Sequence, residues 1–424
     1  MLIEFRFRNY RCFRDEQVLS MVASSDDSLP DNVLVPIEGG KLRLLRSVVI
    51  YGSNASGKTT VLEALHFAQR QVIISARREP DASIDADPYL FDKDSVSGPS
   101  QFEFTFIQER VRYQYGFSVD RERVHSEYLY AAPRGVTVSL FQRNWNNETR
   151  QDDYAFGASL KGPNKTIVEV TRPNALFLSA AGTFKHAMLA APYGWFANKL
   201  NGIQAHLAPL FRKAWMIDPK HHRGTQDLLQ FADLGIEDFR VKEIAPDTEN
   251  EGAAVGDERE SDGQQRKRQS VVVEMLHPSS EKEAVAIRLE RESNGTLHIF
   301  ALSGSLLQAL ADGQAYYVDE LDASMHPLLV RKIVELFQSP VTNRCNAQLI
   351  FNTHDTTLLD NSLFRRDQVW FIEKDSSAAS HLYPLLEFSP RKGEALAKGY
   401  LQGRYGAIPF LGDVSSLFDK ADCS

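Results

Sequence analysis

The chain has 424 residues, of which 43% are hydrophobic and 25% are charged, and it carries a formal net charge of −8 at pH 7. This composition is ordinary for a globular protein, and the acidic balance argues against a surface that coats nucleic acid. No stretch reaches the roughly 18 consecutive apolar residues that a membrane helix needs, and the three cysteines are too scattered for a disulfide framework or a zinc site.

The N-terminal segment predicts a β-strand. Ile3, Phe5 and Phe7 are separated by charged residues, which is the two-residue period of a half-buried strand. This alternation lacks the unbroken apolar run of a signal peptide, so we expect a cytoplasmic protein without a membrane partner. A second, buried strand is predicted over 48–51, and apolar residues then recur at helical spacing from 61 to 68.

The loop between this strand and this helix matches the phosphate-binding P-loop pattern G-x-x-x-x-G-K-[ST] over residues 52–59. Glycines let the backbone wrap closely around phosphates, and the loop amides and the helix N-terminus point toward the anion. Lys58 is expected to reach the β- and γ-phosphates of ATP, and the Thr59 hydroxyl to bind Mg²⁺. The predicted nucleotide-binding residues of this loop are Gly52, Asn54, Ala55, Ser56, Gly57, Lys58, Thr59 and Thr60.

The middle of the chain predicts an antiparallel β-region followed by a helical one. Aromatic residues alternate with polar ones from about 101 to 141, which predicts hairpins with one buried aromatic face. The pattern is helical from about 186 to 233. Residues 246–270 are acidic, then basic, and poor in apolar side chains, which predicts a flexible loop. Strands are predicted again at 271–273 and 284–289.

An acidic pair after a buried strand completes the predicted nucleotide site. The apolar run 315–318 predicts the strand, and Asp319 and Glu320 follow it directly. Asp319 is expected to hold Mg²⁺, directly or through water, and Glu320 to act as the general base for the attacking water. About 260 residues separate this pair from the P-loop, and no Asn-Lys-x-Asp guanine loop is present, so an ABC-type arrangement is favoured over a compact GTPase.

Three further segments follow the order of motifs in ABC-type ATPases. Residues 292–296 precede a helical run and stand where a serine-glycine signature is expected, and residues 321–327 stand where the D-loop is expected. A strand over 348–352 leads to His354, in the place of the switch histidine. The signature residues predicted to contact nucleotide are Ser293, Gly295 and Thr296. The predicted catalytic residues are Lys58, Glu320 and His354.

The order and spacing of these motifs resemble the bacterial AAA15/AAA21-type ATPases, relatives of the RecF, SMC and OLD ATPase heads. Residues 113–117 and 403–409 also resemble stretches in the RloA/AbiL-like ATPases of phage-defence operons. The resemblance implies an α/β fold, an ABC-type P-loop ATPase head with a mixed central sheet, an antiparallel β-subdomain and a helical insertion. We expect a P-loop lobe over 1–185, the insertion and charged loop over 186–270, and the signature-to-histidine lobe over 271–424.

The resemblance also implies how such an ATPase works. In that family the signature does not fold back onto its own P-loop, so a homodimer or higher homo-oligomer with ATP between the heads is expected. Ser293 would then contact the γ-phosphate held by the other subunit, although it could simply cap the helix that follows it. The chain is expected to sense or regulate a separately encoded effector in antiphage defence, such as a Toprim-type nuclease. Only about 70 residues follow His354, too few for a Toprim domain.

Two alternatives rank below this hypothesis. A RecF-like repair clamp would grip DNA when ATP drives its dimerisation. A transporter ATPase subunit ranks last, because residues 293–296 differ from the transporter signature Leu-Ser-Gly-Gly-Gln. The sequence assigns no Q-loop glutamine. Arg11 either approaches the adenine or is a solvated surface charge.

Overall fold

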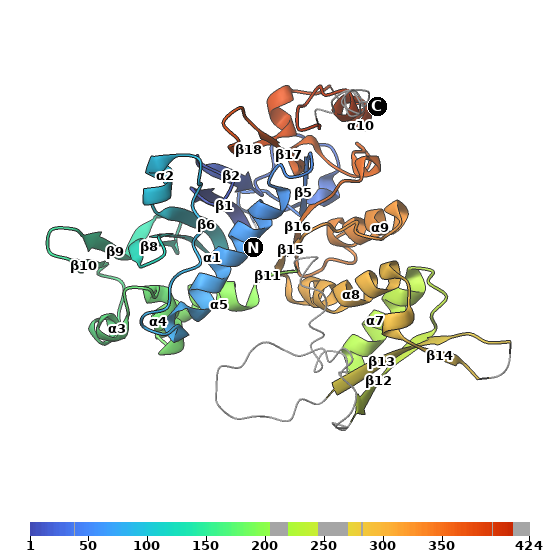
Figure 1. Ribbon diagram of the computed structural model, residues 1–424, viewed down its shortest axis with the longest axis horizontal. Helices are drawn as coiled ribbons and strands as arrows, with labels where there is room; N and C mark the ends of the chain where they lie inside the picture. The colour runs from blue at the N-terminus through green and yellow to red at the C-terminus, as the bar shows by residue number, and fades with distance from the viewer. Residues whose placement is uncertain (38, 204–218, 245–269, 281–282, 392, 410–424) are drawn as a thin grey trace, which may run out of the picture.

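The computed structural model shows two large sheets, with α1 (Lys58–Ile74) between them and further helices on the outer side of the central sheet (Figure 1). It describes residues 1–37, 39–203, 219–244, 270–280, 283–391 and 393–409. The predicted α/β fold with a mixed central sheet and an antiparallel subdomain is therefore confirmed.

One sheet is antiparallel and has seven strands in the order β10-β9-β8-β7-β6-β1-β2. Its strands are β1 (Leu2–Arg8), β2 (Gln17–Ser20), β6 (Ser100–Gln108), β7 (Val111–Val119), β8 (Val124–Ala132), β9 (Val138–Asn146) and β10 (Gln151–Phe156). The predicted N-terminal strand and the predicted hairpins are confirmed. They belong to a single sheet, because β1 pairs with β6 and places Phe5 opposite Phe104.

The central sheet is mixed, with six strands in the order β11-β15-β16-β5-β17-β18. Its strands are β5 (Ser47–Gly52), β11 (Leu200–Ile203), β15 (Ala315–Val318), β16 (Gln348–Asn352), β17 (Val369–Lys374) and β18 (Ser380–Pro384). All pairs are parallel except the one between β17 and β18. Every residue of β5, β15 and β16 is buried, as expected for parallel strands that are covered on both faces.

The two faces of the central sheet belong to two separate cores. Along β5, Val48 and Ile50 pack toward α1 and the antiparallel sheet, whereas Val49 and Tyr51 pack on the opposite side. This division follows from the two-residue period of a strand. Helix α1 is therefore enclosed by apolar side chains of both sheets, which fixes its N-terminus and the P-loop that precedes it.

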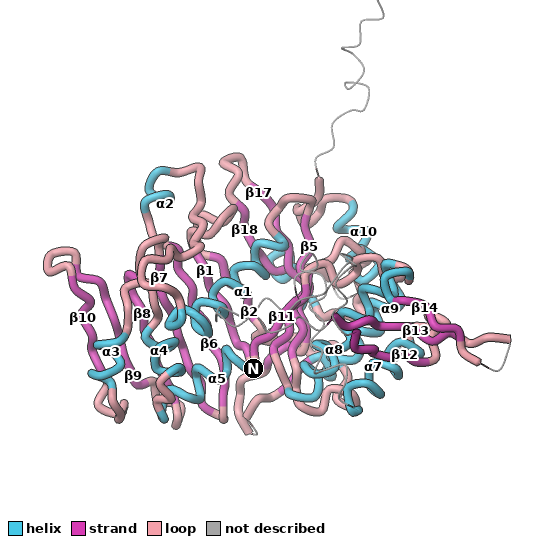
Figure 2. The backbone as a smooth tube through the Cα atoms, turned by 60° about the horizontal axis from the view of Figure 1, so that its bottom comes forward, coloured by secondary structure: helices cyan, strands magenta, loops and turns pink. Residues whose placement is uncertain are grey.

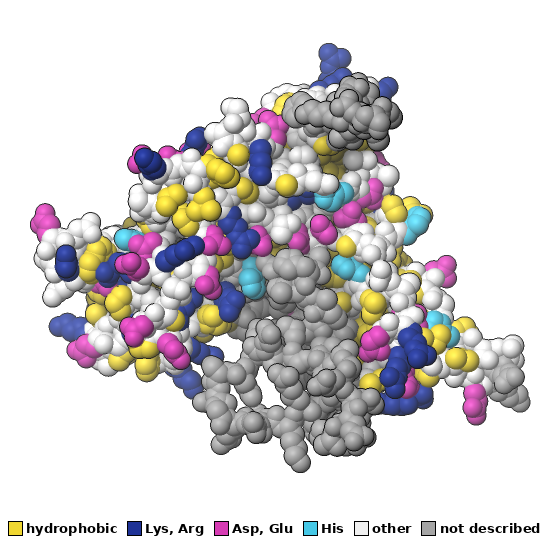
Figure 3. Space-filling model, in the orientation of Figure 1, with side chains coloured by type: hydrophobic (Ala, Val, Ile, Leu, Met, Phe, Trp, Pro, Cys, Tyr) yellow, Lys and Arg dark blue, Asp and Glu magenta, His cyan; other side chains and the backbone are white. Residues whose placement is uncertain are grey.

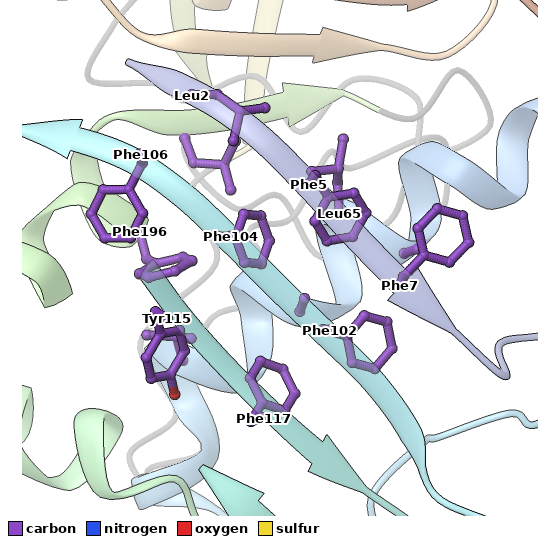
Figure 4. Packing of buried hydrophobic residues seen from close by; sticks show 14 of the residues in the cluster. Leu2, Phe5, Phe7, Leu65, Phe102, Phe104, Phe106, Tyr115, Phe117 and Phe196 are labelled. Atoms are coloured by element: carbon purple, nitrogen blue, oxygen red, sulfur yellow. The ribbon is translucent and has the colours of Figure 1, made fainter. Parts of the chain in front are cut away.

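The aromatic residues of the antiparallel sheet form the floor of the core around α1. Figure 4 shows the phenylalanines of β1 and β6 on one face of the sheet, with Leu65 of α1 and Phe196 of α5 (Ala190–Asn198) beside them. The Phe104 and Phe196 rings meet edge to face with centroids 5.1 Å apart. The expectation that these aromatic stripes serve packing is confirmed. The shorter elements on this side are α2 (Lys93–Ser97), α3 (Asn164–Val170), α4 (Phe177–Thr183), β3 (Val33–Leu34) and β4 (Leu44–Leu45).

Helices cover the other face of the central sheet, and a small sheet lies beyond them (Figure 2). The helices are α7 (Pro219–Phe231), α8 (Asn294–Asp312), α9 (Pro327–Gln338) and α10 (Leu396–Leu401). The antiparallel sheet β12-β13-β14 packs against α7, and its strands are β12 (Asp238–Ile244), β13 (Ser270–His277) and β14 (Val285–Arg288). The strands predicted near 271 and 284 are confirmed.

Within the described residues, the helical prediction over 186–233 is wrong at 200–203, and its part over 204–218 lies outside them. Leu200–Ile203 forms β11, which pairs in parallel with β15 at the edge of the central sheet. Four residues are too few to show a period, and the pairing is decided by tertiary contact. The predicted flexible loop falls almost wholly on 245–269, outside the described residues, and the division at 185 and 270 stays a prediction. Among the described helices, none is long and apolar enough to cross a membrane.

Candidate nucleotide site

The P-loop lies at the carboxyl end of β5, directly before α1. Gly57 caps α1 with a φ of 115°, a conformation that glycine adopts without strain. A Cβ atom at Gly57 would lie 2.8 Å from Sγ of Cys12, and one at Gly52 would lie 2.6 Å from the carbonyl oxygen of Ile372. Both glycines are therefore required by close contacts with the β1–β2 turn and with β17.

Lys58 points into the loop. Its Nζ atom donates hydrogen bonds to the carbonyl oxygens of Gly52 and Ser53, at 2.8 and 2.9 Å. Burial lowers the pKa of Lys58 to about 8, and the negative charges of Glu320 and Asp319 oppose that shift. The amine is still mostly protonated at neutral pH, so the loop holds a positive charge where a phosphate would bind.

The remaining predicted residues of the loop lie at its tip, at the start of α1 and between these two places. Asn54 and Ala55 are exposed at its tip, and Thr59 and Thr60 lie in the first turn of α1. Between them, the buried Oγ atom of Ser56 has no hydrogen-bond partner in the part of the chain that the structure describes. A cradle of glycines, a buried charge and an unpaired hydroxyl are the features that fit a bound phosphate chain.

The acidic pair reaches the P-loop from the neighbouring part of the sheet. Asp319 follows β15 and is 3% exposed, and its Oδ1 atom accepts a hydrogen bond of 3.0 Å from Oγ1 of Thr59. These two residues are the oxygen donors that a P-loop offers to Mg²⁺, so the side chains present fit this ion. Glu320 is exposed at the same edge and has a φ of 49°.

His354 lies beside this group, two residues beyond the end of β16. Its backbone N–H donates to Oδ2 of Asp322 in the D-loop, at 3.3 Å. Burial, together with the charge of Lys58, lowers the pKa of the imidazole, and the nearby carboxylates oppose this. The ring is therefore neutral at pH 7. The structure thus brings Lys58, Thr59, Asp319 and His354 together at the carboxyl ends of β5, β15 and β16.

The signature segment begins α8 and contacts the D-loop. Oγ of Ser293 accepts a hydrogen bond from the Thr296 amide at 3.1 Å, so the capping role is confirmed. A Cβ atom at Gly295 would lie 2.7 Å from the carbonyl oxygen of Ser324. Within the described residues, no hydrogen bond joins Ser293–Thr296 to the P-loop of the same chain. A role for this segment at the nucleotide of a second chain stays a prediction.

Arg11 and Asn352 are the last two residues whose place in the structure bears on the site. Arg11 is paired with the carboxylates of Glu63 and Asp87, so it is a partnered surface charge, and an approach to adenine stays a prediction. Asn352, which the sequence did not single out, contacts both Asp319 and Glu320. A polar residue at the last position of an otherwise apolar strand beside the acidic pair is the signal that could have found it.

This geometry defines a P-loop nucleotide site. The family model AAA_21, described as "AAA domain, putative AbiEii toxin, Type IV TA system", matches residues 47–360, which is more than half of the chain. The chain belongs to this family. No curated protein sequence matches it.

Three solved structures of SMC heads are similar to the chain. An Smc head bound to the C-winged helix domain of ScpA has a TM-score of 0.43 and 12% identity, and the match covers 90% of this chain and 97% of that one. The SMC head domain from Thermotoga maritima has a TM-score of 0.39 and 11% identity, and the match covers 90% of this chain and 98% of that one. The third structure is an Smc head with an extended coiled coil, bound to the C-terminal domain of ScpA derived from Pyrococcus furiosus. It has a TM-score of 0.38 and 11% identity, and the match covers 92% of this chain and 97% of that one.

Proposed function

We propose that the protein binds and hydrolyses ATP with Mg²⁺, that two or more copies assemble around the nucleotide, and that this cycle regulates a separately encoded effector, a nuclease, in antiphage defence. The hydrogen bond between Thr59 and Asp319 is the observation that supports ATP binding and hydrolysis. It joins the P-loop to the acidic pair, although 260 positions of sequence separate the two residues. The defence part is supported by the description of the family, which refers to a toxin of a type IV toxin–antitoxin system.

The chemistry assigns one task to each side chain. Lys58 exchanges its two carbonyl partners for phosphate oxygens, so its charge faces the β- and γ-phosphates. Thr59 and Asp319 would hold Mg²⁺, which neutralises phosphate charge when it is bound. Glu320 accepts the proton of the attacking water. The neutral imidazole of His354 orients that water or the γ-phosphate.

The proposal of a composite site rests on the accessible start of α8. A helix N-terminus presents backbone amides that have no partner within the helix, and it is suited to an anion. Ser293 is exposed and makes its described contacts within its own helix turn, so the start of α8 is accessible to the nucleotide of a second head. A two-fold arrangement of heads would pair each α8 with the P-loop of the other chain.

The DNA clamp remains the second candidate. On the face drawn in Figure 3, basic and acidic side chains are interspersed among the coloured residues and form no continuous basic patch. Nonspecific DNA binding depends on such a patch, because it is driven by contacts between lysine or arginine and phosphate. On this one face, the distribution of charge gives no support to the clamp.

Turnover by Glu320→Gln tests the proposed ATPase. An amide cannot accept the proton of the water, so the variant should bind ATP with unchanged affinity and release phosphate at least about a hundredfold more slowly than wild type. Size-exclusion chromatography with light scattering should show ATP-bound dimers accumulating. Wild-type phosphate release by Glu320→Gln would show that the base lies elsewhere.

A further inference from the structure

Asn352 is the last residue of β16 and is completely buried, with 0% of its surface exposed. Strand β16 lies between β15, which leads to the acidic pair, and β5, which leads to the P-loop. A fully buried asparagine must satisfy its amide group by hydrogen bonds within the protein. Its partners are therefore decisive for what it does.

Those partners are three consecutive residues of the turn after β15. The Nδ2 group donates to Oδ1 of Asp319 at 2.6 Å, and the Oδ1 atom accepts from the Glu320 amide at 2.5 Å. The carbonyl oxygen of Asn352 also accepts from the Leu321 amide at 3.3 Å. The amide orientation is dictated by chemistry: a backbone N–H can only donate, so the oxygen must face Glu320 and the NH₂ group must face the carboxylate.

The contact with Asp319 determines which carboxylate oxygen is available. Oδ1 receives two donors, Nδ2 of Asn352 and Oγ1 of Thr59. Oδ2 has no hydrogen bond in the part of the chain that the structure describes, so it is the oxygen left for Mg²⁺ or for its water shell. Rotation of the carboxylate would break two hydrogen bonds at once.

The contact with Glu320 supports an unusual backbone conformation. Glu320 has a φ of 49°, in the left-handed region that residues other than glycine seldom adopt. The hydrogen bond from its amide to Asn352 helps to hold that conformation. In this conformation the Glu320 side chain is exposed directly after the buried Asp319.

We propose that Asn352 is a positioning residue for ATP hydrolysis, which sets the carboxylate of Asp319 for Mg²⁺ and the backbone of Glu320 for its role as base. The inference rests on the proposed function. Asn352 itself touches neither ATP nor water in this assignment; it acts through the two acids. A neutral amide suits this position, because its NH₂ group donates to the carboxylate while its oxygen accepts from the backbone N–H.

Two substitutions and a matched control test this assignment. Asn352→Asp keeps the shape but replaces the donor with a second carboxylate facing Asp319, and Asn352→Leu keeps the volume without any hydrogen bond. The control is Gln348→Leu, at the opposite end of the same strand. Gln348 is also 0% exposed, and its side chain bonds to the backbone of Leu2 and Leu45.

The readout is the affinity for a fluorescent ATP analogue, measured in EDTA and at saturating Mg²⁺, together with kcat, KM and thermal stability. Both Asn352 variants should bind the analogue in EDTA as tightly as the wild type does. The Mg²⁺-dependent gain, which is the factor by which Mg²⁺ increases the affinity, should be about 10- to 100-fold smaller than in the wild type, and kcat should fall by a similar factor. Gln348→Leu should lose thermal stability while its Mg²⁺-dependent gain is unchanged.

The outcomes separate this inference from the function on which it rests. If the wild type neither binds nor hydrolyses ATP, the proposed function fails. If the wild type is active and both Asn352 variants keep the Mg²⁺-dependent gain and kcat, the positioning role alone is overturned. The same holds if the variants lose only stability, to the same extent as Gln348→Leu. If Asn352→Leu does not fold, the isosteric Asn352→Asp decides the question.

Discussion

Subunit complementation is the most demanding test of the composite site. Lys58→Ala removes the charge inside the P-loop, and Ser293→Arg places a long side chain at the start of α8. Ser293 is exposed, so the arginine can extend without disturbing the core, and the loss of the helix cap costs about 1 kcal/mol. Each variant alone should be inactive, because in a dimer of either one both sites carry a defect.

The expected recovery follows from how the defects are distributed. A mixed dimer has one site with both defects and one site with an intact P-loop and an intact signature. With random exchange at equal concentrations, half of the dimers are mixed and each has one working site of two. The rate should therefore recover to about a quarter of the wild-type rate if the sites act independently.

Phosphate release before and after mixing is the assay, and native mass spectrometry measures the fraction of mixed dimers. Ser293→Ala is the matched control, since it removes the same hydroxyl and helix cap but adds no large side chain. It should keep part of the activity, because the backbone amides at the start of α8 remain available to the phosphate. No recovery in a sample with confirmed mixed dimers would refute independent composite sites. Wild-type turnover by monomeric Ser293→Arg would refute the composite site altogether.

Two further predictions concern buried charge. Arg143 is 0% exposed and donates to Asp152 at 2.8 Å, so Arg143→Met should lower the free energy of unfolding by about 3–5 kcal/mol in denaturant titrations. Arg121 is exposed and serves as the control, because Arg121→Met should change this free energy by less than about 0.5 kcal/mol. The pKa of Lys58 is lowered to about 8, so the amine loses its charge as the pH rises through 8. ATP affinity should then fall by up to about tenfold per pH unit above 8, and a similar fall in Lys58→Ala would contradict this assignment.

The motif residues of the site could be predicted because their signals are local. A P-loop is a contiguous pattern between a buried strand and a helix, and the acidic pair ends a strand of only apolar and aromatic residues. The motifs assign Thr59 and Asp319 to the same Mg²⁺ ion and so predict that they lie close together, but the hydrogen bond between them is seen only in the structure. The structure supplies the adjacency of the strands that carry them, through β16 between β15 and β5.

The rest could not be predicted because it depends on pairing between distant segments. The period of β1 indicates a strand, but nothing local indicates that its neighbour is β6, almost a hundred residues away. Strand β11 is too short to have a period, and its state is set by β15. The role of Asn352 depends on the neighbouring strand in the same way, since its partners are 32 and 33 positions earlier.

Calorimetric titration of the wild type and Lys58→Ala with ATP and Mg²⁺ tests the central claim most directly. The wild type should bind one ATP per chain. Lys58→Ala should stay folded, as judged by thermal denaturation, and bind at least about a hundredfold more weakly, because it lacks an ammonium group that makes charge-assisted bonds with the phosphates. Unchanged affinity in a folded Lys58→Ala protein would contradict the assignment of residues 52–59 as the nucleotide site.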